Sequence, residues 1–197
     1  MWTNSRLMRN LSRVALPVLL LLTACGGLTT SDKPVTRTWM LMPLEQSSGS
    51  EPSAEVTTIE LSVAAVPGLD TDKILTLSSE AELNHFAGAR WAEHTPEMLE
   101  SLLARSLQGS GKFEVVASQA DCDLHLEVAE FYAYTGSSGV ASEVRIEIDG
   151  QYSCRSEKSK PILLQASIPV HENKMSTIVA AFQEGVNKAW IKLMAIL

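Results

Sequence analysis

One cysteine of the chain lies where a lipid could be attached. Cys25 ends the motif LTAC (residues 22–25), directly after the short apolar run of residues 14–24. A leucine, two small residues and a cysteine in this place are typical of a bacterial lipobox, in which a diacylglycerol is attached to the thiol and the chain is cleaved just before it. We therefore expect Cys25 to be lipidated and to become the first residue of the processed protein.

The segment before Cys25 has the composition of a secretory signal. Three arginines lie within its first 13 residues and no acidic residue occurs before Asp32. A basic start followed by a short apolar run is the usual layout of such a signal. A membrane-spanning helix needs about 20 apolar residues, roughly twice what this run offers. We predict that residues 1–24 are removed; the alternative to lipid-linked cleavage is an ordinary signal cleaved at its small residues.

The residues after the cysteine bear on where the protein is held. Gly26 stands where an aspartate would keep a lipoprotein at the inner membrane in enterobacterial-type sorting, so we expect an outer-membrane anchor and a body facing the periplasm. Two or more acyl chains hold a protein stably on a bilayer, whereas one chain holds it only reversibly. Residues 26–34 are small and polar, which predicts a flexible tether between lipid and body.

Two further cysteines could form a disulfide bond. Cys122 and Cys154 lie on two segments in which apolar and polar residues alternate, on either side of the turn sequence TGSSG. An antiparallel register that pairs Val128 with Ile148 also pairs the two cysteines, and directly opposed residues can meet the distance that a disulfide requires. The oxidising compartment implied by the signal favours the bond over two buried free thiols. A bulge is expected near Glu130, where the alternation breaks.

Known catalytic and metal-binding motifs do not occur in the sequence. It has no HExxH, no GxSxG, no phosphate loop and no cysteine pair at metal-ligand spacing. Three acids near a strand start suggest either a Ca²⁺ site or, more commonly, a solvated acidic edge. We predict no enzyme activity, no metal and no cofactor, and we expect His125 to be solvated. The histidines are His85, His94, His125 and His171, and the three acids are Asp121, Asp123 and Glu127.

The charge of the processed chain restricts its partners. Removing three arginines with the signal leaves 13 basic residues against 23 acidic ones, a net charge of −10. A nucleic-acid-binding protein needs a basic surface, so this class is excluded. Electrostatic adhesion to anionic lipid is equally disfavoured. A hydrophobic content of 45% is sufficient for a folded core, which we assign to a single domain of residues 35–197.

The pattern of the chain predicts the elements of this domain. Thr95 as N-cap, Pro96 and an acid begin a helix over about 95–108, and a stripe of apolar residues predicts a second helix over about 174–197. Segments with alternating apolar residues predict strands. We expect an α+β fold with an antiparallel-rich mixed sheet and both amphipathic helices packed on one face. The strand segments are 35–41, 57–66, 73–79, 81–93, 112–116, 123–134, 143–154 and 162–170.

The order of several short motifs resembles that of a known family, the ABC-type transport auxiliary lipoproteins, a group that includes PqiC. After the lipobox come an aromatic-x-Leu strand, a Val-Pro turn, Arg-Trp-Ala-Glu before an amphipathic helix, and a Gly-x-Phe-x-x-Val strand entry. The resemblance covers nearly all of the processed chain. The sequence departs from the family pattern at His94, where proline is usual, and at Trp39, where tyrosine is common. The motifs are residues 39–41, 66–69, 90–93 and 111–116.

This resemblance implies a function that the residues alone do not. Such lipoproteins accompany MCE-domain proteins and ABC or membrane subunits that move lipids between the two membranes, and they support envelope integrity without being enzymes. It implies docking to an MCE-domain (PqiB-like) subunit, attachment to the membrane through the lipid, and leaves a homo-oligomer open. Two alternatives stay beside it: another scaffold lipoprotein in outer-membrane or surface-polymer assembly, and a periplasmic enzyme whose site is assembled from scattered residues.

Overall fold

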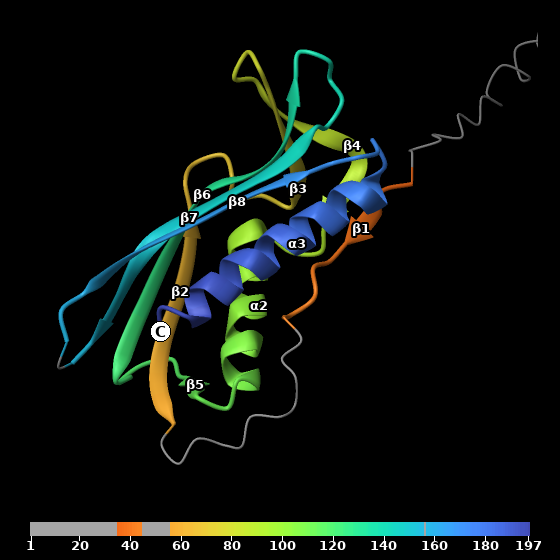
Figure 1. Cartoon of the computed structure of the whole chain (residues 1–197). Helices are drawn as coiled ribbons and strands as arrows, with labels where there is room; N and C mark the ends of the chain where they lie inside the picture. The colour runs from red at the N-terminus through yellow and green to blue at the C-terminus, as the bar shows by residue number, and fades with distance from the viewer. Residues whose placement is uncertain (1–34, 45–55, 156) are drawn as a thin grey trace, which may run out of the picture. The chain divides into compact units, whose positions relative to one another are not determined.

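The computed structural model describes residues 35–44, 56–155 and 157–197 (Figure 1). The strands are β1 (Arg37–Trp39), β2 (Thr57–Ala65), β3 (Lys73–Ser78), β4 (Leu83–Trp91), β5 (Phe113–Val115), β6 (Cys122–Gly136), β7 (Glu143–Cys154) and β8 (Lys160–Pro169), and the helices are α2 (Thr95–Gly109) and α3 (Met175–Met194). The predicted signal, Cys25 and the predicted tether all lie outside the described residues.

The strands form one mixed sheet whose longest member is β6. On one side β6 pairs with β7, which in turn pairs with β8, and both pairings are antiparallel. On its other side β6 pairs in parallel with β2 near its start and with β3 near its end. The sheet continues from β3 to β4 and β1, and from β2 to β5. The predicted mixed sheet with two helices is confirmed, and its two longest ladders are antiparallel.

A bulge in β6 explains why one strand serves two partners on the same side. The register with β7 shifts between Val128 and Glu130, where the alternation of the sequence breaks, as predicted. Before the bulge the even-numbered side chains face the core, and after it Phe131 and Ala133 do. A bulge bends its strand and increases the local twist. The two halves of β6 therefore run in different directions, and each meets a different parallel neighbour.

Helix α2 begins one residue earlier than the predicted cap implied. The N-cap position is His94, which has an extended backbone and makes no capping hydrogen bond with its side chain, so the prediction that Thr95 is the N-cap is wrong. Thr95 is the first helical residue; its buried hydroxyl donates to the carbonyl of Thr71 at 3.2 Å. A tertiary contact to the loop between β2 and β3 thus uses the hydroxyl that the local pattern assigned to the cap.

Helix α3 buries the stripe that its sequence predicts. Phe182, Val186 and Trp190 are fully buried, while the helix ends at Met194, three residues before the predicted end. Gly185 allows close packing, because a Cβ there would lie 2.7 Å from Cδ1 of Ile146 on β7. The helix therefore lies closer to the sheet than a larger residue would permit.

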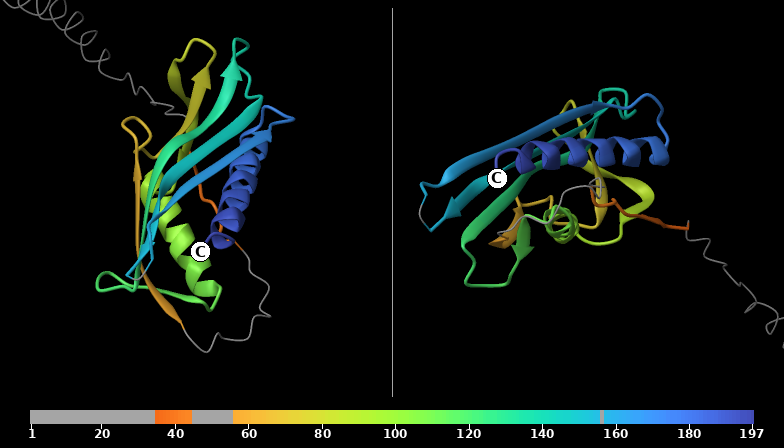
Figure 2. Two further views of the ribbon diagram at one scale, coloured as in Figure 1. Left: turned by 60° about the vertical axis from the view of Figure 1, so that its left-hand side comes forward. Right: turned by 60° about the horizontal axis from the view of Figure 1, so that its bottom comes forward.

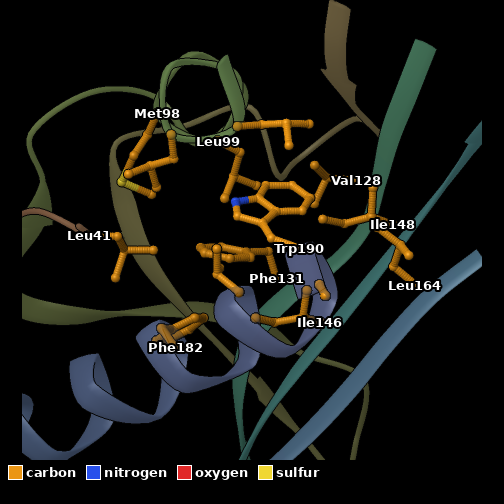
Figure 3. Close-up of a cluster of buried hydrophobic side chains, with 14 of the residues drawn as sticks. Leu41, Met98, Leu99, Val128, Phe131, Ile146, Ile148, Leu164, Phe182 and Trp190 are labelled. Atoms are coloured by element: carbon orange, nitrogen blue, oxygen red, sulfur yellow. The ribbon is translucent and has the colours of Figure 1, made fainter. Parts of the chain in front are cut away.

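Both helices lie on the same side of the sheet, as predicted (Figure 2). Helix α3 packs on β7 and β8, and α2 packs on β2 and β5. Between them and the sheet lies an aromatic cluster in which the ring centroids of Phe131 and Phe182 are 4.8 Å apart and Trp91 meets Phe182 edge-on at 5.3 Å. Trp190 lies at the centre of the same core, among apolar side chains of both helices and of the sheet (Figure 3).

Candidate functional site

The described body begins close to the predicted lipid anchor. Nine residues lie between Cys25 and Val35, and the ten steps of chain from one to the other can span at most about 35 Å when fully extended. Within the described part of the chain, no helix is long and apolar enough to cross a membrane. If Cys25 carries lipid, the body must therefore work within a few nanometres of the bilayer. Lipidation of Cys25 stays a prediction.

A short segment after β1 connects this N-terminal end to both helices. We call residues 40–44 the strap. The backbone N–H of Met42 donates to Oε1 of Gln183 on α3 at 2.7 Å, and Nε2 of Gln183 donates back to the carbonyl of Met42 at 2.9 Å. The N–H of Leu44 donates to Oγ of Ser106 on α2 at 3.3 Å. The amide side chain of Gln183 thus makes the two backbone hydrogen bonds that a neighbouring strand would ordinarily make with an extended segment.

The side chains of the strap divide between core and surface. Leu41 is 1% exposed, whereas Met40 and Met42 are 59% and 60% exposed. Methionine side chains on a surface are flexible and polarisable, and they suit interfaces that must adapt to a partner. The strap therefore combines an anchored core residue with two accessible apolar ones, next to the end of the body that leads to Cys25.

The two cysteines of the body form a disulfide in the structure. Cys122 at the start of β6 and Cys154 at the end of β7 are directly paired, with sulfurs 2.06 Å apart. Cys122 is buried, and its Sγ accepts a hydrogen bond from the hydroxyl of Tyr152 at 3.3 Å. The bond closes the open end of the β6–β7 hairpin, and the predicted register between Val128 and Ile148 is present.

One group of side chains in the described residues has the spacing of metal ligands. Asp70, His94 and Glu97 bring ligand atoms within 4.8 Å of one another at the start of α2, and all three are exposed. Nδ1 of His94 lies 2.9 Å from Oδ1 of Asp70, and this hydrogen bond raises the pKa of His94. No local pattern of the sequence indicates the group, because Asp70 lies in a distant loop.

The three acids that the sequence analysis noted near the start of β6 do not form one site. Oδ2 of Asp121 accepts a hydrogen bond from the hydroxyl of Thr58 at 2.6 Å, and this bond lowers the pKa of Asp121. The side chains of Asp123 and Glu127 belong to the outer face of the sheet, where Glu127 is exposed. The structure thus distributes the three acids along an edge and a face of the sheet. His85 and His171 are exposed as well.

A serine and a histidine meet on the outer face of the sheet. Oγ of Ser62 on β2 lies 2.6 Å from Nδ1 of His125 on β6, because the parallel pairing of these strands places the two residues side by side. His125 is exposed, as predicted. Among the described residues, no carboxylate is hydrogen-bonded to its other ring nitrogen. A nucleophile–base pair normally needs such a third group to orient the base, and the described residues do not supply one to His125.

The outer face of the sheet, opposite the helices, carries a group of acidic side chains. Directly opposed pairs of like charge occur at Glu127 and Asp149, and at Glu130 and Glu147. Like charges directly opposite one another destabilise a sheet. We call this surface the acidic face; its acids are Glu60, Asp123, Glu127, Glu130, Glu143, Glu147 and Asp149.

One cation lies within the acidic face. The guanidinium of Arg145 pairs with Glu143 and stacks on the ring of Tyr134, with Cζ 4.0 Å from the ring centroid. The hydroxyl of Ser167 also donates to Glu143 at 2.6 Å, and these contacts lower the pKa of that carboxyl group. Arg145 is thus already paired with Glu143 within the face.

The chain matches one known protein family over most of its described body. The model of one protein family, described as "ABC-type transport auxiliary lipoprotein component", matches residues 40–190. The chain belongs to this family. The match extends from the strap to Trp190 in α3, so it includes every element of the body except β1. No curated protein matches the chain.

Solved structures share the fold at low sequence identity. The crystal structure of protein XCC0632 from Xanthomonas campestris, assigned to family DUF330, has a TM-score of 0.67 and 20% identity, covering 80% of this chain and 92% of that one. A crystal structure described as an uncharacterized protein has a TM-score of 0.63 and 13% identity, covering 82% and 97%. The PelC dodecamer from Paraburkholderia phytofirmans is 12% identical, with coverage of 68% and 88%, but its TM-score of 0.36 is too low to support an argument.

Proposed function

We propose that this lipoprotein is the docking subunit of an intermembrane lipid transport system, anchored in the outer membrane through Cys25 and facing the periplasm. The observation that carries the proposal is the family match over residues 40–190, which makes the chain an auxiliary component of ABC-type transport. The motif around Cys25 and the following Gly26 support the outer-membrane anchor. An MCE-domain (PqiB-like) subunit reaching across the periplasm is the proposed partner.

In this proposal the protein works through a surface rather than through catalysis. The Ser62–His125 pair has no orienting carboxylate among the described residues, and the group around His94 is open to solvent. The acidic face is a better candidate, because its opposed acids are unfavourable for the isolated body. A basic surface on the partner would offset that repulsion and would accelerate association at low salt.

Crosslinking in cells tests the docking role. A photo-reactive amino acid at Gln165, which lies on β8 beside Glu147 of the acidic face, should capture an MCE-domain subunit. The matched control is position 184 on α3, where Glu184 is exposed on the opposite side of the body. Charge reversal by E147K together with D149K should reduce the captured product at least tenfold, whereas E184K should leave it unchanged.

The same cells give a functional readout. Loss of the protein should sensitise cells to detergent and alter lipid distribution between the two membranes. Crosslinking that captures no transport component, together with an unchanged envelope in the deletion strain, would contradict the docking role. Capture of outer-membrane or surface-polymer assembly proteins instead would favour the other scaffold function. A homo-oligomer would appear in the same experiment as a crosslink between two copies of this chain.

A further inference from the structure

Strand β8 forms an open edge of the sheet. It pairs with β7 on one side, and among the described residues no strand pairs with its other side (Figure 2). The pairs with β7 run from Lys160 to Pro169 without a shift of register. Natural proteins usually block such an edge with charged residues, prolines or bulges. The central residues 162–168 (ILLQASI) contain none of these, so this part of the edge can accept another strand.

The odd-numbered residues of β8 direct their backbone groups to the open edge. In an antiparallel ladder, alternate residues exchange hydrogen bonds with the neighbouring strand. The N–H of Val170 donates to the carbonyl of Ser142 just before β7, so the even-numbered positions face β7. The carbonyl of Leu163 accordingly points away from β7 and accepts a hydrogen bond from Nζ of Lys192 at 2.8 Å. The residues with both backbone groups at the open edge are Leu163, Gln165 and Ser167.

Two prolines make this edge symmetric about Gln165. Pro161 and Pro169 lie at equal distances before and after it, also at positions that face outward, and proline has no N–H to donate. If a second copy pairs antiparallel with Gln165 opposite Gln165, Leu163 pairs with Ser167 of the other copy and the prolines fall opposite one another. Every outward N–H of the edge then has a carbonyl opposite it, and the ladder ends at the prolines.

The side chains of the edge allow two acidic molecules to meet. Leu163, Gln165 and Ser167 lie on the outer face of the sheet and are uncharged, and Leu163 is 48% exposed. Gln165 also donates to Glu147 on the neighbouring strand at 2.6 Å. Two uncharged strands would therefore separate the acids of one copy from those of the other. The pairing would place no like charges directly opposite one another, which would destabilise it.

Helix α3 carries opposite charges beside the two ends of this edge. Glu184 lines a surface depression together with Ile168 and Pro169, at one end of β8. Lys192 reaches the carbonyl of Leu163, nearer the other end. Both charged side chains are exposed, and their separation of a little over two helical turns places them on the same side of the helix. An acid and a base thus flank the edge on the helix side.

A two-fold axis through Gln165 would pair these charges between copies. Such an axis, normal to the sheet, keeps both helix layers on one side and reverses the direction of β8 and α3 in the second copy. Lys192 of one copy is then brought toward the end of the edge at which Glu184 of the other copy lies. Its ammonium group would exchange the carbonyl of Leu163 for a carboxylate, which is the stronger hydrogen-bond acceptor.

We propose that two copies of this protein associate through their β8 strands, in an antiparallel ladder centred on Gln165 and flanked by ion pairs between Glu184 and Lys192 of different copies. An interface about a two-fold axis uses the same patch on both subunits, as this one does. The two acidic faces then lie on one side of a continuous sheet. Self-association is measured with the purified protein alone, so its failure and the failure of docking are distinguishable.

Single cysteine substitutions test the register. In this ladder the two copies of residue 165 lie opposite one another with Cα atoms about 5.5 Å apart, a distance that a disulfide can bridge. The two copies of residue 163 lie about 13 Å apart along the strands. Gln165→Cys should therefore give a disulfide-linked dimer when the lipidated protein is oxidised in detergent. Leu163→Cys and Ser167→Cys should each stay unlinked alone and become linked when the two proteins are mixed.

Proline substitution tests whether the open edge holds the dimer together. Gln165→Pro removes the outward N–H but no hydrogen bond to β7, and proline is tolerated on edge strands. Gln165→Ala is the matched control, because it keeps the N–H. Sedimentation velocity in detergent should show a dimer for wild type and Gln165→Ala, and a dissociation constant raised at least about tenfold in Gln165→Pro, which loses two hydrogen bonds per dimer. Near-UV circular dichroism checks that each variant is folded.

Exchange of the two charges tests the helix side of the interface. Lys192→Glu should weaken the dimer, and addition of Glu184→Lys in the same chain should restore it. Three results would overturn the proposal. They are a wild-type protein that stays monomeric at every concentration, a Gln165→Pro protein that dimerises as well as Gln165→Ala, and linked dimers that form equally at residues 163, 165 and 167, which would indicate random encounters within a shared micelle.

Discussion

At the scale of single residues, several positions are constrained by close contacts with residues that are distant in the sequence. Gly150 of β7 is the tightest case, because a Cβ there would lie 2.0 Å from the carbonyl oxygen of His125. His94 is another, since its charge is stabilised by an acid from a distant loop. Both cases give predictions in which one substitution changes one contact.

Replacement of Gly150 by alanine should strongly destabilise the protein. The clashing atom belongs to the backbone of β6, so the two central strands must separate to admit the methyl group. Overpacking of this kind typically costs about 1–3 kcal/mol or more. Urea unfolding of Gly150→Ala measures the loss. Gly109→Ala is the control, because nothing lies within 4 Å of its Cβ position; an equal loss in both variants would contradict the explanation.

His94 should stabilise the protein more at low pH than at high pH. Its pKa is raised above 6.5, chiefly by the hydrogen bond to Asp70, so the folded state binds the proton more tightly than the unfolded state. The stabilisation is complete below pH 6.5 and is lost as the pH rises through the raised pKa. Unfolding of wild type and His94→Gln between pH 5 and pH 8.5 should show a difference that shrinks with rising pH.

Asp70→Asn provides the control for this effect. This substitution removes the negative charge beside His94 while keeping a side chain of similar shape at the same place. In the Asp70→Asn background, His94→Gln should produce a much smaller pH-dependent change. A pH dependence that persists undiminished would mean that other acids near the start of α2 govern the titration of His94.

At the scale of elements, the β6–β7 hairpin organises the body. It contributes the longest ladder of the sheet, one bulge that divides β6 between two parallel partners, and a disulfide across its open end. Its strand β7 packs against α3. The stability of the whole sheet therefore depends on keeping this hairpin closed.

Loss of the disulfide should be measurable as a loss of stability without loss of fold. The two cysteines are 32 residues apart, for which the chain-entropy model gives about 3–4 kcal/mol. The double variant Cys122→Ala, Cys154→Ala should unfold at a correspondingly lower urea concentration. Wild type treated with a reductant should match it. Two free thiols in protein purified from the periplasm without reductant would contradict the presence of the bond.

At the scale of the whole molecule, two surfaces and one anchor have to be coordinated. The acidic face and the strap lie on opposite sides of the sheet, and the strap lies only 15 residues after Cys25 in the chain. In a body held near a bilayer, the acidic face is thus available to a partner on the side of the sheet away from the strap. The anchor is the condition for docking in the cell.

Cys25→Ala should abolish attachment to the membrane. Without the thiol no diacylglycerol can be added, and we expect an uncleaved precursor that retains residues 1–24. Labelling of cells with radioactive palmitate should mark the wild type and not the variant. The double disulfide variant, which retains Cys25, serves as the control and should label normally. Equal labelling of wild type and Cys25→Ala would refute lipidation at this position.

The sequence by itself determined the features that depend on neighbouring residues. The alternation of apolar residues in 123–134 and 143–154 was sufficient for the hairpin, its register and its bulge, because residues joined by a short turn have few other ways to pair. The apolar stripes determined both helices and their buried faces. The LTAC motif predicts the anchor on the same local basis, and this prediction lies outside the described residues.

Only the tertiary structure decided which distant segments meet. The parallel pairing of β2 with β6 joins Ser62 to His125, and no local pattern specifies a parallel partner across an intervening helix. Thr95 does not act as the N-cap, because its hydroxyl donates a hydrogen bond to the carbonyl of Thr71 in a loop from another part of the chain. The strap and the acidic face arise in the same way. Alternation shows which side of a strand is buried, but the packing of the whole chain determines what lies beside it.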